Sequence, residues 1–286
     1  MKVGITGYNG FIGSNLHRFL TYKHIEIIFI EKRWLYNSPK LLAEKIEGLD
    51  AIINLAGASI NKRWSRKYKL EIYQSRVKTT KNLVKAISLC KKRPKKFISA
   101  SAIGIYDSTH KHDEQSNYLA SSFLGKVCRD WEAAALHAEN YGIEVSIVRF
   151  GIVLGPNGGM LKKLLPIFKW GLGGTIGNGK QTMSFIHIDD LISILYSILT
   201  ESIAASVYNA TTPYPTTNKD FTITFAKKLK RPHFLTVPDF MLKILFGEGA
   251  EVLTSGQFVL PQALIEKNFT FQYLTIDQAI QASLLY

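Results

Sequence analysis

The chain has 286 residues, 46% of them hydrophobic and 20% charged, so it can bury one large core, or one core and a smaller domain. No run approaches the roughly 18 to 20 consecutive apolar residues that span a membrane. The N-terminus begins with a strand-like segment at the place where a signal peptide would have its apolar h-region. We therefore expect a cytoplasmic protein. Cys90 and Cys128 are too few for a disulfide framework and lack metal-ligand spacing, so we expect two reduced helix cysteines.

The net charge of +14 is concentrated in one basic segment, residues 61–96, which holds 14 lysines and arginines and a single acid, Glu71. Such a segment could bind nucleic acid or another polyanion. Apolar side chains nevertheless recur in it at helical spacing, which places most of the lysines on the opposite face. The apolar positions are Leu70, Tyr73, Val77, Thr80, Val84 and Ile87, and the lysines are Lys69, Lys78, Lys81 and Lys85. We favour a solvated helix face here over binding to nucleic acid or another polyanion.

Short apolar segments alternate with helical patterns in the first half of the chain. Strands are expected at 1–6, 25–30, 51–56, 96–101 and 145–149, with one helix from residue 11, one ending at residue 89, and one at 123–141. This alternation predicts a Rossmann-type, doubly wound parallel sheet with helices on both faces.

After residue 149 the regular alternation of strands and helices gives way to glycine-rich loops. Two glycine-rich loops, "LGPNGGM" at 154–160 and "WGLGGTIGNGKQ" at 170–181, flank a short apolar helix and are interpreted as a pocket wall. Helices near 218–230 and 240–246 follow proline turns. We expect a sheet domain over residues 1–212, with 155–185 contributing to its pocket, and a small, mainly helical domain over 213–286. Ligands would bind in the crevice at the carboxyl edge of the sheet.

The stretch "ITGYNGFIGSNL", residues 5–16, places glycines at Gly7, Gly10 and Gly13, between an expected strand and a helix. Glycines permit positive φ and close approach of a ligand to the backbone, and the free N–H groups at the helix start attract anions. The spacing is one residue wider than the dehydrogenase fingerprint. The order strand, glycine turn, helix predicts a dinucleotide phosphate site, so residues 1–212 are expected to be the dinucleotide-binding domain.

The residues after the second strand should choose the cofactor, because they meet the adenosine ribose. Glu31 would bond a ribose 2'-hydroxyl and favour NAD, whereas Lys32 and Arg33 would neutralise a 2'-phosphate and favour NADP. The signals conflict. We favour NADP(H) over NAD(H), because two adjacent cations outweigh one acid.

Five ordered motifs resemble the extended short-chain dehydrogenase/reductases related to nucleotide-sugar epimerases and dehydratases. They are "TGYNGFIG" (6–13), "NLAGASI" (54–60), "SASAIGIY" (99–106), "VRFGIVLGP" (148–156) and "GNGKQTMSFIHIDDL" (177–191). The stretches "NLAGASINKRW" and "FLGKVCRDWEAAA", together with the tail from Val237, resemble more narrowly an atypical epimerase-family branch that ends in a C-terminal domain of unknown function. The resemblance covers essentially the whole chain.

The resemblance implies a set of cofactor contacts. The glycine turn would cradle the pyrophosphate, residues 55–57 would pass under adenine and ribose, and Ser99 would approach the nicotinamide ribose. Arg76 stands where most relatives carry an asparagine. The implied cofactor-binding residues are Gly7, Tyr8, Asn9, Gly10, Phe11, Ile12, Gly13, Glu31, Lys32, Arg33, Leu55, Ala56, Gly57, Arg76 and Ser99.

Relatives usually supply a tyrosine with a lysine four residues later, the lysine lowering the pKa of the tyrosine and holding the cofactor ribose. This chain lacks the pair. Alignment on Lys126 puts Ser122 at the tyrosine position, and alignment on Glu132 puts Leu124 there and Cys128 at the lysine. The candidate catalytic residues that remain are Ser101, Tyr106 and Lys126.

Met183 stands where sugar-nucleotide enzymes commonly keep an arginine for the substrate diphosphate, which argues against an ordinary nucleotide sugar. A partly apolar pocket is suggested by four large apolar residues, Trp64, Leu172, Phe185 and Phe246. Packing in the core would explain each of them equally well. His187 with Asp189 and Asp190, and the run "HKHDE" at 110–114, could ligate a metal, but we favour a structural role for the first and a solvated loop for the second, and expect no metal site.

These observations predict an NAD(P)-binding oxidoreductase or epimerase-like enzyme for a small-molecule substrate, without a membrane partner and with a homodimer as one option. The alternative is a non-catalytic NADP(H)-binding sensor or regulator, which the missing tyrosine and lysine pair suggests. Binding of a polyanion by residues 61–96 is the third hypothesis.

Overall fold

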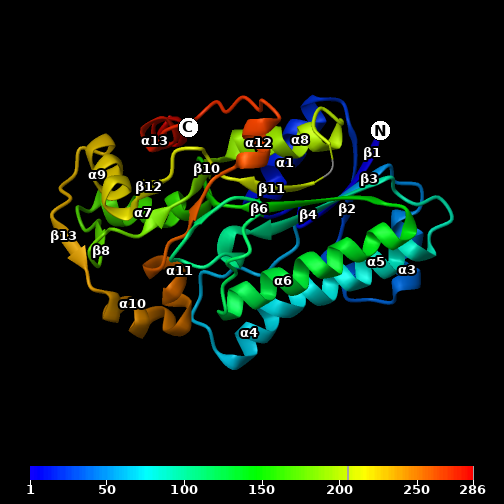
Figure 1. Cartoon of the computed structure of the whole chain (residues 1–286), viewed down its shortest axis with the longest axis horizontal. Helices are drawn as coiled ribbons and strands as arrows, with labels where there is room; N and C mark the ends of the chain where they lie inside the picture. Colours follow the sequence, from blue (N-terminus) through cyan, green and yellow to red (C-terminus); the bar gives the residue numbers. More distant parts are fainter. Residues whose placement is uncertain (205, 286) are drawn as a thin grey trace.

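The computed structural model describes residues 1–204 and 206–285 and is built on a six-stranded sheet (Figure 1). The strand order is β11-β6-β4-β3-β1-β2, and every neighbouring pair is parallel. The strands are β1 (Lys2–Thr6), β2 (Glu26–Ile30), β3 (Ala51–Asn54), β4 (Lys96–Ala102), β6 (Glu144–Phe150) and β11 (Val207–Ala210). The predicted Rossmann-type parallel sheet is confirmed. Only the sixth strand, β11, has no counterpart among the expected strands.

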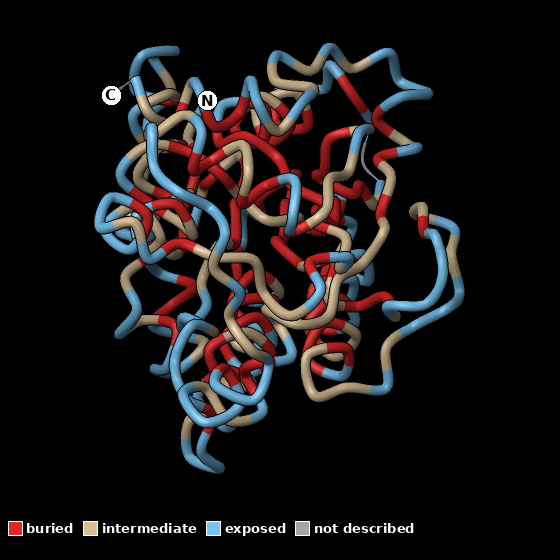
Figure 2. Tube along the Cα trace, turned by 90° about the vertical axis from the view of Figure 1, so that its left-hand side faces the viewer, coloured by how far each residue is buried: buried red, intermediate tan, exposed pale blue. Residues whose placement is uncertain are grey.

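Helices cover both faces of the sheet (Figure 1). On one face α1 (Phe11–Tyr22) packs beside α8 (Ile188–Leu199), and on the other α5 (Thr79–Leu89) contacts both α3 (Pro39–Ile46) and α6 (Phe123–Leu136). The buried residues of β3 alternate between two apolar layers, with Ile53 in the layer under α1 and α8 and Ile52 in the layer under α3 and α5. Figure 2 shows this buried interior enclosed by exposed loops and helix faces.

One apolar position in the basic segment departs from the prediction, because Leu70 is 54% exposed. The expected continuous helix is three pieces: α4 (Arg66–Tyr73), a π-helical turn η1 (Gln74–Lys78), and α5. A π-turn inserts one residue into the helical repeat and rotates everything before it about the axis. Val77, Val84 and Ile87 are therefore buried as expected, whereas on the far side of the turn Ile72 replaces Leu70 in the interior.

The remaining elements form small additions around the carboxyl edge of the sheet and the C-terminal region. Four two-stranded pairings occur: β7 with β10, β8 with β13, β9 with β12, and β5 with β14. The strands are β5 (Lys111–His112), β7 (Ile152–Leu154), β8 (Gly174–Ile176), β9 (Thr182–Met183), β10 (Phe185–His187), β12 (Thr216–Thr217), β13 (Leu235–Val237) and β14 (Phe258–Val259). The helices are α2 (Lys32–Leu35), α7 (Gly159–Lys169), α9 (Asn218–Lys228), α10 (Asp239–Phe246), α11 (Glu251–Thr254), α12 (Gln262–Glu266) and α13 (Ile276–Leu284), with short 3-10 turns η2 (Ile103–Ile105), η3 (His137–Tyr141) and η4 (Gly247–Ala250).

The C-terminal region is mainly helical, as predicted, and it is tied to the sheet domain by contacts that start far apart in the sequence. The β5–β14 pair joins residue 111 to residue 258, and the Glu114 carboxylate accepts N–H groups from Asn209 (2.8 Å) and Ala263 (3.1 Å). The division at residues 212 and 213 into two folding units stays a prediction. In the described part of the chain, no helix is both long and apolar enough to cross a membrane.

Candidate functional site

The glycine turn between β1 and α1 has a backbone that larger residues could not follow. Gly7 has a φ of +66°, and the N–H of Gly10 donates to its carbonyl at 2.9 Å. A Cβ on Gly7 would lie 2.6 Å from the carbonyl oxygen of Leu55, and a Cβ on Gly13 would lie 2.3 Å from that of Gly7. These two glycines therefore let the turn close tightly against both α1 and the loop after β3.

The start of α1 leaves its first N–H groups without partners in the helix. The helix begins at Phe11 after Gly10, which has no side chain to cap it, and the first bond within the helix runs from the N–H of Ser14 to the carbonyl of Gly10. The N–H groups of residues 11–13 thus have no acceptor within the helix and lie at the positive end of its dipole. A Cβ on Gly10 would meet only the carbonyl of Gly7, at 3.2 Å, so the backbone is otherwise open to a ligand. The residues present fit a phosphate group.

A buried hydroxyl fixes the loop after β3 beside this turn. The Thr6 hydroxyl accepts the N–H groups of Leu55 (2.9 Å) and Ala56 (3.0 Å) and donates to Oδ1 of Asn54 (2.8 Å). Since a hydroxyl offers one proton and two lone pairs, Thr6 is fully used. The loop that carries residues 55–57 is consequently held at the same edge of the sheet as the glycine turn.

At the end of β2, Glu31, which would favour NAD, forms an ion pair with Arg33, which would favour NADP. The guanidinium of Arg33 donates to both oxygens of Glu31, Nε at 2.7 Å and Nη2 at 3.0 Å. The Arg33 side chain is 74% exposed, and Lys32 forms no ion pair with any residue that the structure describes. Nearby, Tyr8 of the glycine turn stacks on Phe29 at a ring separation of 4.4 Å. One of the two cations thus neutralises the acid, and Lys32 has no ion-pair partner among the described residues.

Two of the three candidate catalytic residues lie in one buried polar cluster, here called the Arg149 network: Ser101, Tyr106, Glu132, Arg149 and Asn209. The Ser101 hydroxyl donates to Glu132 at 2.5 Å, and Arg149 donates to both oxygens of that carboxylate at 2.9 and 2.8 Å. Arg149 also donates to the Tyr106 hydroxyl at 2.6 Å, which in turn lies 2.9 Å from Oδ1 of Asn209. The five side chains bond one another across α6 and the ends of β4, β6 and β11.

Tyr106 is fully buried, and its ring stacks on His112 at 4.7 Å. Burial raises the pKa of its phenol, although Arg149 opposes the shift. Burial also acts to lower the pKa of Arg149, but the Glu132 carboxylate outweighs it and holds that pKa above its ordinary value. A neutral phenol with both hydrogen-bonding directions occupied is built to hold structure rather than to exchange a proton with a ligand.

Lys126, the third candidate, lies on the outer face of α6. Its side chain is 63% exposed, and its ammonium pairs with Asp130 at 2.7 Å, where the Tyr73 hydroxyl also donates. Of the two alignments, the one on Glu132 fits the buried face: Cys128 lies on it, whereas Ser122 only caps the helix by accepting the N–H of Gly125. Lys126 is therefore not brought together with Ser101 and Tyr106.

Arg76 approaches the site from the π-turn η1. Its Nη2 donates to the carbonyl of Ala58 at 3.0 Å, and its guanidinium lies over the Trp131 ring at 5.4 Å. A Cβ on Gly57 would come within 3.0 Å of the guanidinium, so that glycine lets the side chain lie flat against the loop after β3. Ser99, by contrast, is fully buried and accepts from Asn54 at 3.4 Å.

The residues predicted to line a substrate pocket differ in how far they are buried. Met183 is buried, with its sulfur 3.9 Å from the amide of Asn218, and Phe185 belongs to the core. Trp64 is also buried and packs edge-on to Phe123 at 5.6 Å. Leu172 is instead exposed. The apolar character that the sequence suggested is thus largely core packing.

The structural role favoured for the "HIDD" segment agrees with its geometry. His187 is the N-cap of α8, where its Nδ1 accepts the N–H of Asp189 at 3.3 Å. Asp190 accepts the N–H groups of Gln272 (2.7 Å) and Tyr273 (3.0 Å) and so ties α8 to the C-terminal region. The solvated loop expected for "HKHDE" is only partly correct: His110 is exposed and pairs with Asp107, but His112 lies in β5 and is buried against Tyr106.

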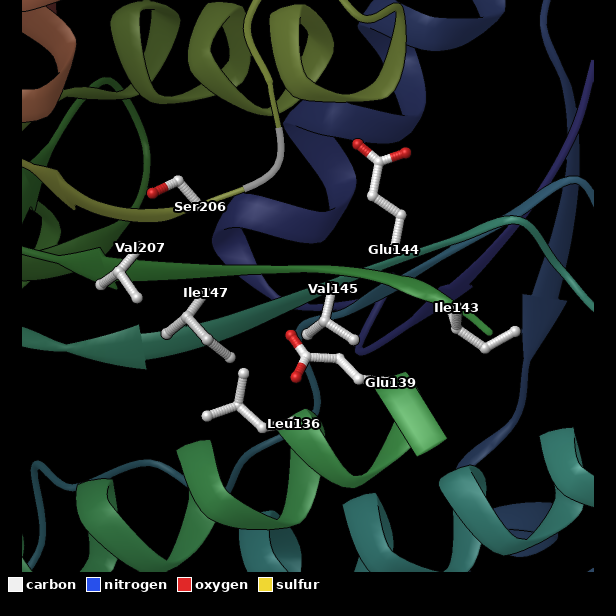
Figure 3. Close-up of a pocket in the computed structure, with 8 residues that line it drawn as sticks. All are labelled: Leu136, Glu139, Ile143, Glu144, Val145, Ile147, Ser206 and Val207. Atoms are coloured by element: carbon white, nitrogen blue, oxygen red, sulfur yellow. The ribbon is translucent and has the colours of Figure 1, made fainter. Parts of the chain in front are cut away.

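Two open cavities lie away from the glycine turn. One of about 340 Å³ is lined by Leu136, Glu139 and the amino-terminal half of β6, at the opposite end of the strand from the crevice (Figure 3). The other, of about 300 Å³, lies between the second glycine-rich loop and α10, with Lys180, Gln181 and Asp239 among its lining residues. Of these two, the second includes part of the predicted pocket wall.

Sequence reasoning did not identify three members of the Arg149 network as site residues: Glu132, Arg149 and Asn209. Arg149 is a charged residue inside an otherwise apolar strand, "EVSIVRF", and Asn209 lies in the short apolar strand β11. A charge in a strand buried on both faces requires a partner, so Arg149 could have been flagged from the pattern. Its partners could not have been identified from the pattern, because Glu132 and Tyr106 lie 17 and 43 residues away along the chain.

A parallel six-stranded sheet with a glycine turn after its first strand defines a Rossmann-fold protein of the extended short-chain dehydrogenase/reductase type. The chain belongs to the NAD dependent epimerase/dehydratase family, whose model matches residues 3–211, and a domain of unknown function, DUF1731, matches residues 237–283. The predicted family and its C-terminal domain are thereby confirmed.

Relatives of similar length match over nearly the whole chain. An epimerase family protein of Arabidopsis thaliana, the chloroplastic SDR39U1 homolog, is 38% identical over 99% of this chain and 86% of its own. The epimerase family protein YfhF of Bacillus subtilis is 33% identical over 98% and 97%. A crystal structure of human epimerase family protein SDR39U1 (isoform 2) with NADPH has a TM-score of 0.89 at 29% identity and 99% coverage of both chains. UDP-glucuronic acid 4-epimerase from Bacillus cereus with NAD, at 18% identity and a TM-score of 0.77, shares the fold.

Proposed function

We propose that this protein binds NADP(H) at the glycine turn and acts as an oxidoreductase or epimerase-like enzyme on a small or partly apolar alcohol or carbonyl compound. The observation that carries the proposal is the geometry of the turn: the N–H groups of residues 11–13, the open backbone at Gly10, and the close packing that Gly7 and Gly13 permit. The human relative crystallised with NADPH supports the same choice of cofactor. When bound, the nicotinamide would supply or accept a hydride.

The preference for NADP(H) rests on the end of β2. Exposed ion pairs contribute only about 0 to 1 kcal/mol, so a 2'-phosphate could draw Arg33 away from Glu31 at little cost. Lys32 has no ion pair to give up among the described residues, so it could bind the 2'-phosphate directly. A ribose 2'-hydroxyl, by contrast, would have to compete with Arg33 for the Glu31 carboxylate.

The substrate is expected not to be an ordinary nucleotide sugar. A diphosphate needs cations or N–H donors, and Met183 offers a buried thioether at the position where such enzymes commonly keep an arginine. The cavity between the second glycine-rich loop and α10 is lined mainly by polar side chains, with Lys180 as its one lysine.

A non-catalytic NADP(H)-binding sensor or regulator is the second candidate, and the Arg149 network favours it. Ser101 and Tyr106 are bonded to other side chains in the core, and Lys126 pairs with Asp130 on the outer face of α6. An enzyme of this family type needs a residue that moves a proton at the reacting hydroxyl.

The two candidates differ in turnover. NADPH oxidation should be followed with a broad panel of aldehydes and ketones, using the wild-type protein and Ser101→Ala. Turnover that falls with Ser101→Ala supports the enzyme. NADPH binding without any oxidation, together with a protein partner captured only when NADPH is present, supports the sensor. Absence of NADPH binding contradicts both.

A further inference from the structure

The helix α10 is apolar on almost every side, yet it is hardly buried. Phe240, Ile244 and Leu245 are 63%, 64% and 61% exposed, and Met241 is exposed as well. Within residues 239–246, all of which the structure describes, only Leu242 is buried. A helix that is apolar all round is ordinarily covered, so these four side chains point to a partner outside the described part of the chain.

A basic segment lies directly beside the carboxyl end of α10. The N–H of Trp64 donates to the carbonyl of Phe246 at 3.4 Å. Lys69 of α4 pairs with Glu248 in η4, the turn that follows α10. Residues 62–67 and α10 therefore form one continuous surface, on the lower side of the molecule in Figure 1.

This surface carries an excess of exposed positive charge. Among the residues that the structure describes, none of its five exposed cations takes part in an ion pair. Of the acids nearby, Glu248 is already paired with Lys69, which leaves Asp239 at the other end of α10 and Glu251 in α11. The five cations are Lys62, Arg63, Arg66, Lys67 and Lys243.

The combination of bulky apolar side chains with free cations selects among partners. In a symmetric dimer built on this surface, the cations of one copy would meet those of the other, because a two-fold interface uses the same patch twice. Nucleic acid would bind the cations and leave the apolar helix in water. An anionic lipid bilayer satisfies both requirements, since its headgroups attract lysine and arginine and its acyl boundary takes up apolar side chains.

We propose that α10, together with residues 62–67, binds peripherally to the surface of a membrane that contains anionic phospholipids. The exposed apolar side chains of α10 enter the boundary between headgroups and acyl chains, and the five cations contact the headgroup phosphates. Such binding departs from the sequence-based expectation of no membrane partner, and it does not depend on whether the glycine turn holds a dinucleotide.

Co-sedimentation with vesicles of phosphatidylcholine, alone and mixed with phosphatidylglycerol, tests this proposal. We expect the wild type to bind the anionic vesicles at least about tenfold more tightly than the neutral ones. This preference should fade as the salt rises from about 0.1 M to about 1 M, because the Debye length then falls from about 10 Å to about 3 Å.

Two double variants separate the apolar and the electrostatic contributions. Ile244→Gln with Leu245→Gln removes apolar contact and should weaken binding to the anionic vesicles at least about tenfold. Arg66→Gln with Lys67→Gln should weaken that binding by about tenfold and leave binding to the neutral vesicles unchanged.

Matched controls carry the same changes on another part of the surface. Leu41→Gln with Leu89→Gln replaces two leucines of α3 and α5 that are 49% and 48% exposed. Lys91→Gln with Lys92→Gln replaces two exposed lysines that follow α5. Both control variants should bind the anionic vesicles within about twofold of the wild type.

The proposal is overturned if the wild type binds neither kind of vesicle, if the apolar double variant binds as tightly as the wild type, or if the controls lose as much. Sedimentation velocity tests the second copy as occupant: a wild-type dimer that the apolar double variant converts to a monomer would make this surface a subunit interface and contradict membrane binding. If that double variant does not fold by circular dichroism, Ile244→Gln alone decides by the same comparison. A wild type that binds NADPH but no vesicles contradicts the membrane proposal and leaves the proposed function standing.

Discussion

The Glu132 carboxylate accepts two hydrogen bonds from the Arg149 guanidinium, at 2.9 and 2.8 Å, and so joins α6 to β6 inside the protein. Both side chains are almost fully buried. Removal of one charge leaves the other without compensation in a medium of low polarity, so we expect Glu132→Gln to lower the free energy of unfolding by about 3 to 5 kcal/mol. Urea unfolding followed by circular dichroism measures this. Asp130→Asn, which breaks the exposed pair two residues earlier, is the matched control and should change stability little.

Tyr106→Phe removes the hydroxyl that contacts Arg149, the side chain of Asn209 and the carbonyl of Asp113. The phenyl ring still fills the space, but three polar groups lose a partner, so we expect a loss of about 1 to 3 kcal/mol in the free energy of unfolding. NADPH affinity should stay within about twofold of the wild type. If stability is unchanged while NADPH turnover with a carbonyl substrate disappears, Tyr106 is catalytic and its structural assignment is wrong.

Lys32 and Arg33 should set the choice between the two cofactors. We expect the double substitution Lys32→Ala with Arg33→Ala to raise the Kd for NADPH about tenfold or more and to leave that for NADH unchanged or lower, because Glu31 then becomes free to accept a ribose hydroxyl. Fluorescence titration with each cofactor gives both constants. Equal weakening of NADPH and NADH would show that these residues do not read the 2'-phosphate.

The two cysteines should be inert in the folded protein. Burial raises the pKa of Cys90 to about 11 and that of Cys128 to about 12. Neither thiol ionises near neutral pH, so a thiol reagent at pH 8 should titrate none in the native protein and both after denaturation. Rapid labelling of either one in the native state would contradict the burial.

The same shifts predict how stability depends on pH. The folded pKa values lie above the unfolded value of about 9, so the unfolded chain loses protons first as the pH rises. The contribution is constant below about pH 8 and is lost above pH 9, at up to about 1.4 kcal/mol per pH unit for each thiol. Cys128→Ala should therefore show a shallower fall in unfolding free energy between pH 9 and 11 than the wild type. Parallel curves would contradict this.

The glycine turn was predictable because its signal is local. Three glycines, the strand before them and the helix after them lie within about twenty residues, and each requirement follows from the backbone itself. The alternation of strands and helices predicted the sheet for the same reason.

The state of the candidate catalytic residues was not predictable, because it depends on contacts between distant parts of the chain. Tyr106 meets a partner 103 residues away, and Ser101 one 31 residues away. Nothing near either residue in the sequence shows that its hydroxyl is already used. The exposure of Leu70 was missed for a different reason: the π-turn changes the helical repeat, and no glycine or proline between residues 66 and 89 marks it.

The central claim, that the turn from Gly7 to Gly13 holds a dinucleotide, is tested most directly by titration calorimetry of NADPH and NADH into the wild type and Gly13→Ala. The Cβ that this substitution adds would lie 2.3 Å from the carbonyl of Gly7 and force the turn apart. We expect the wild type to bind NADPH more tightly than NADH, and Gly13→Ala to lose at least about tenfold in affinity for both. A folded wild-type protein that gives no binding heat and no thermal stabilisation with either dinucleotide would contradict the claim.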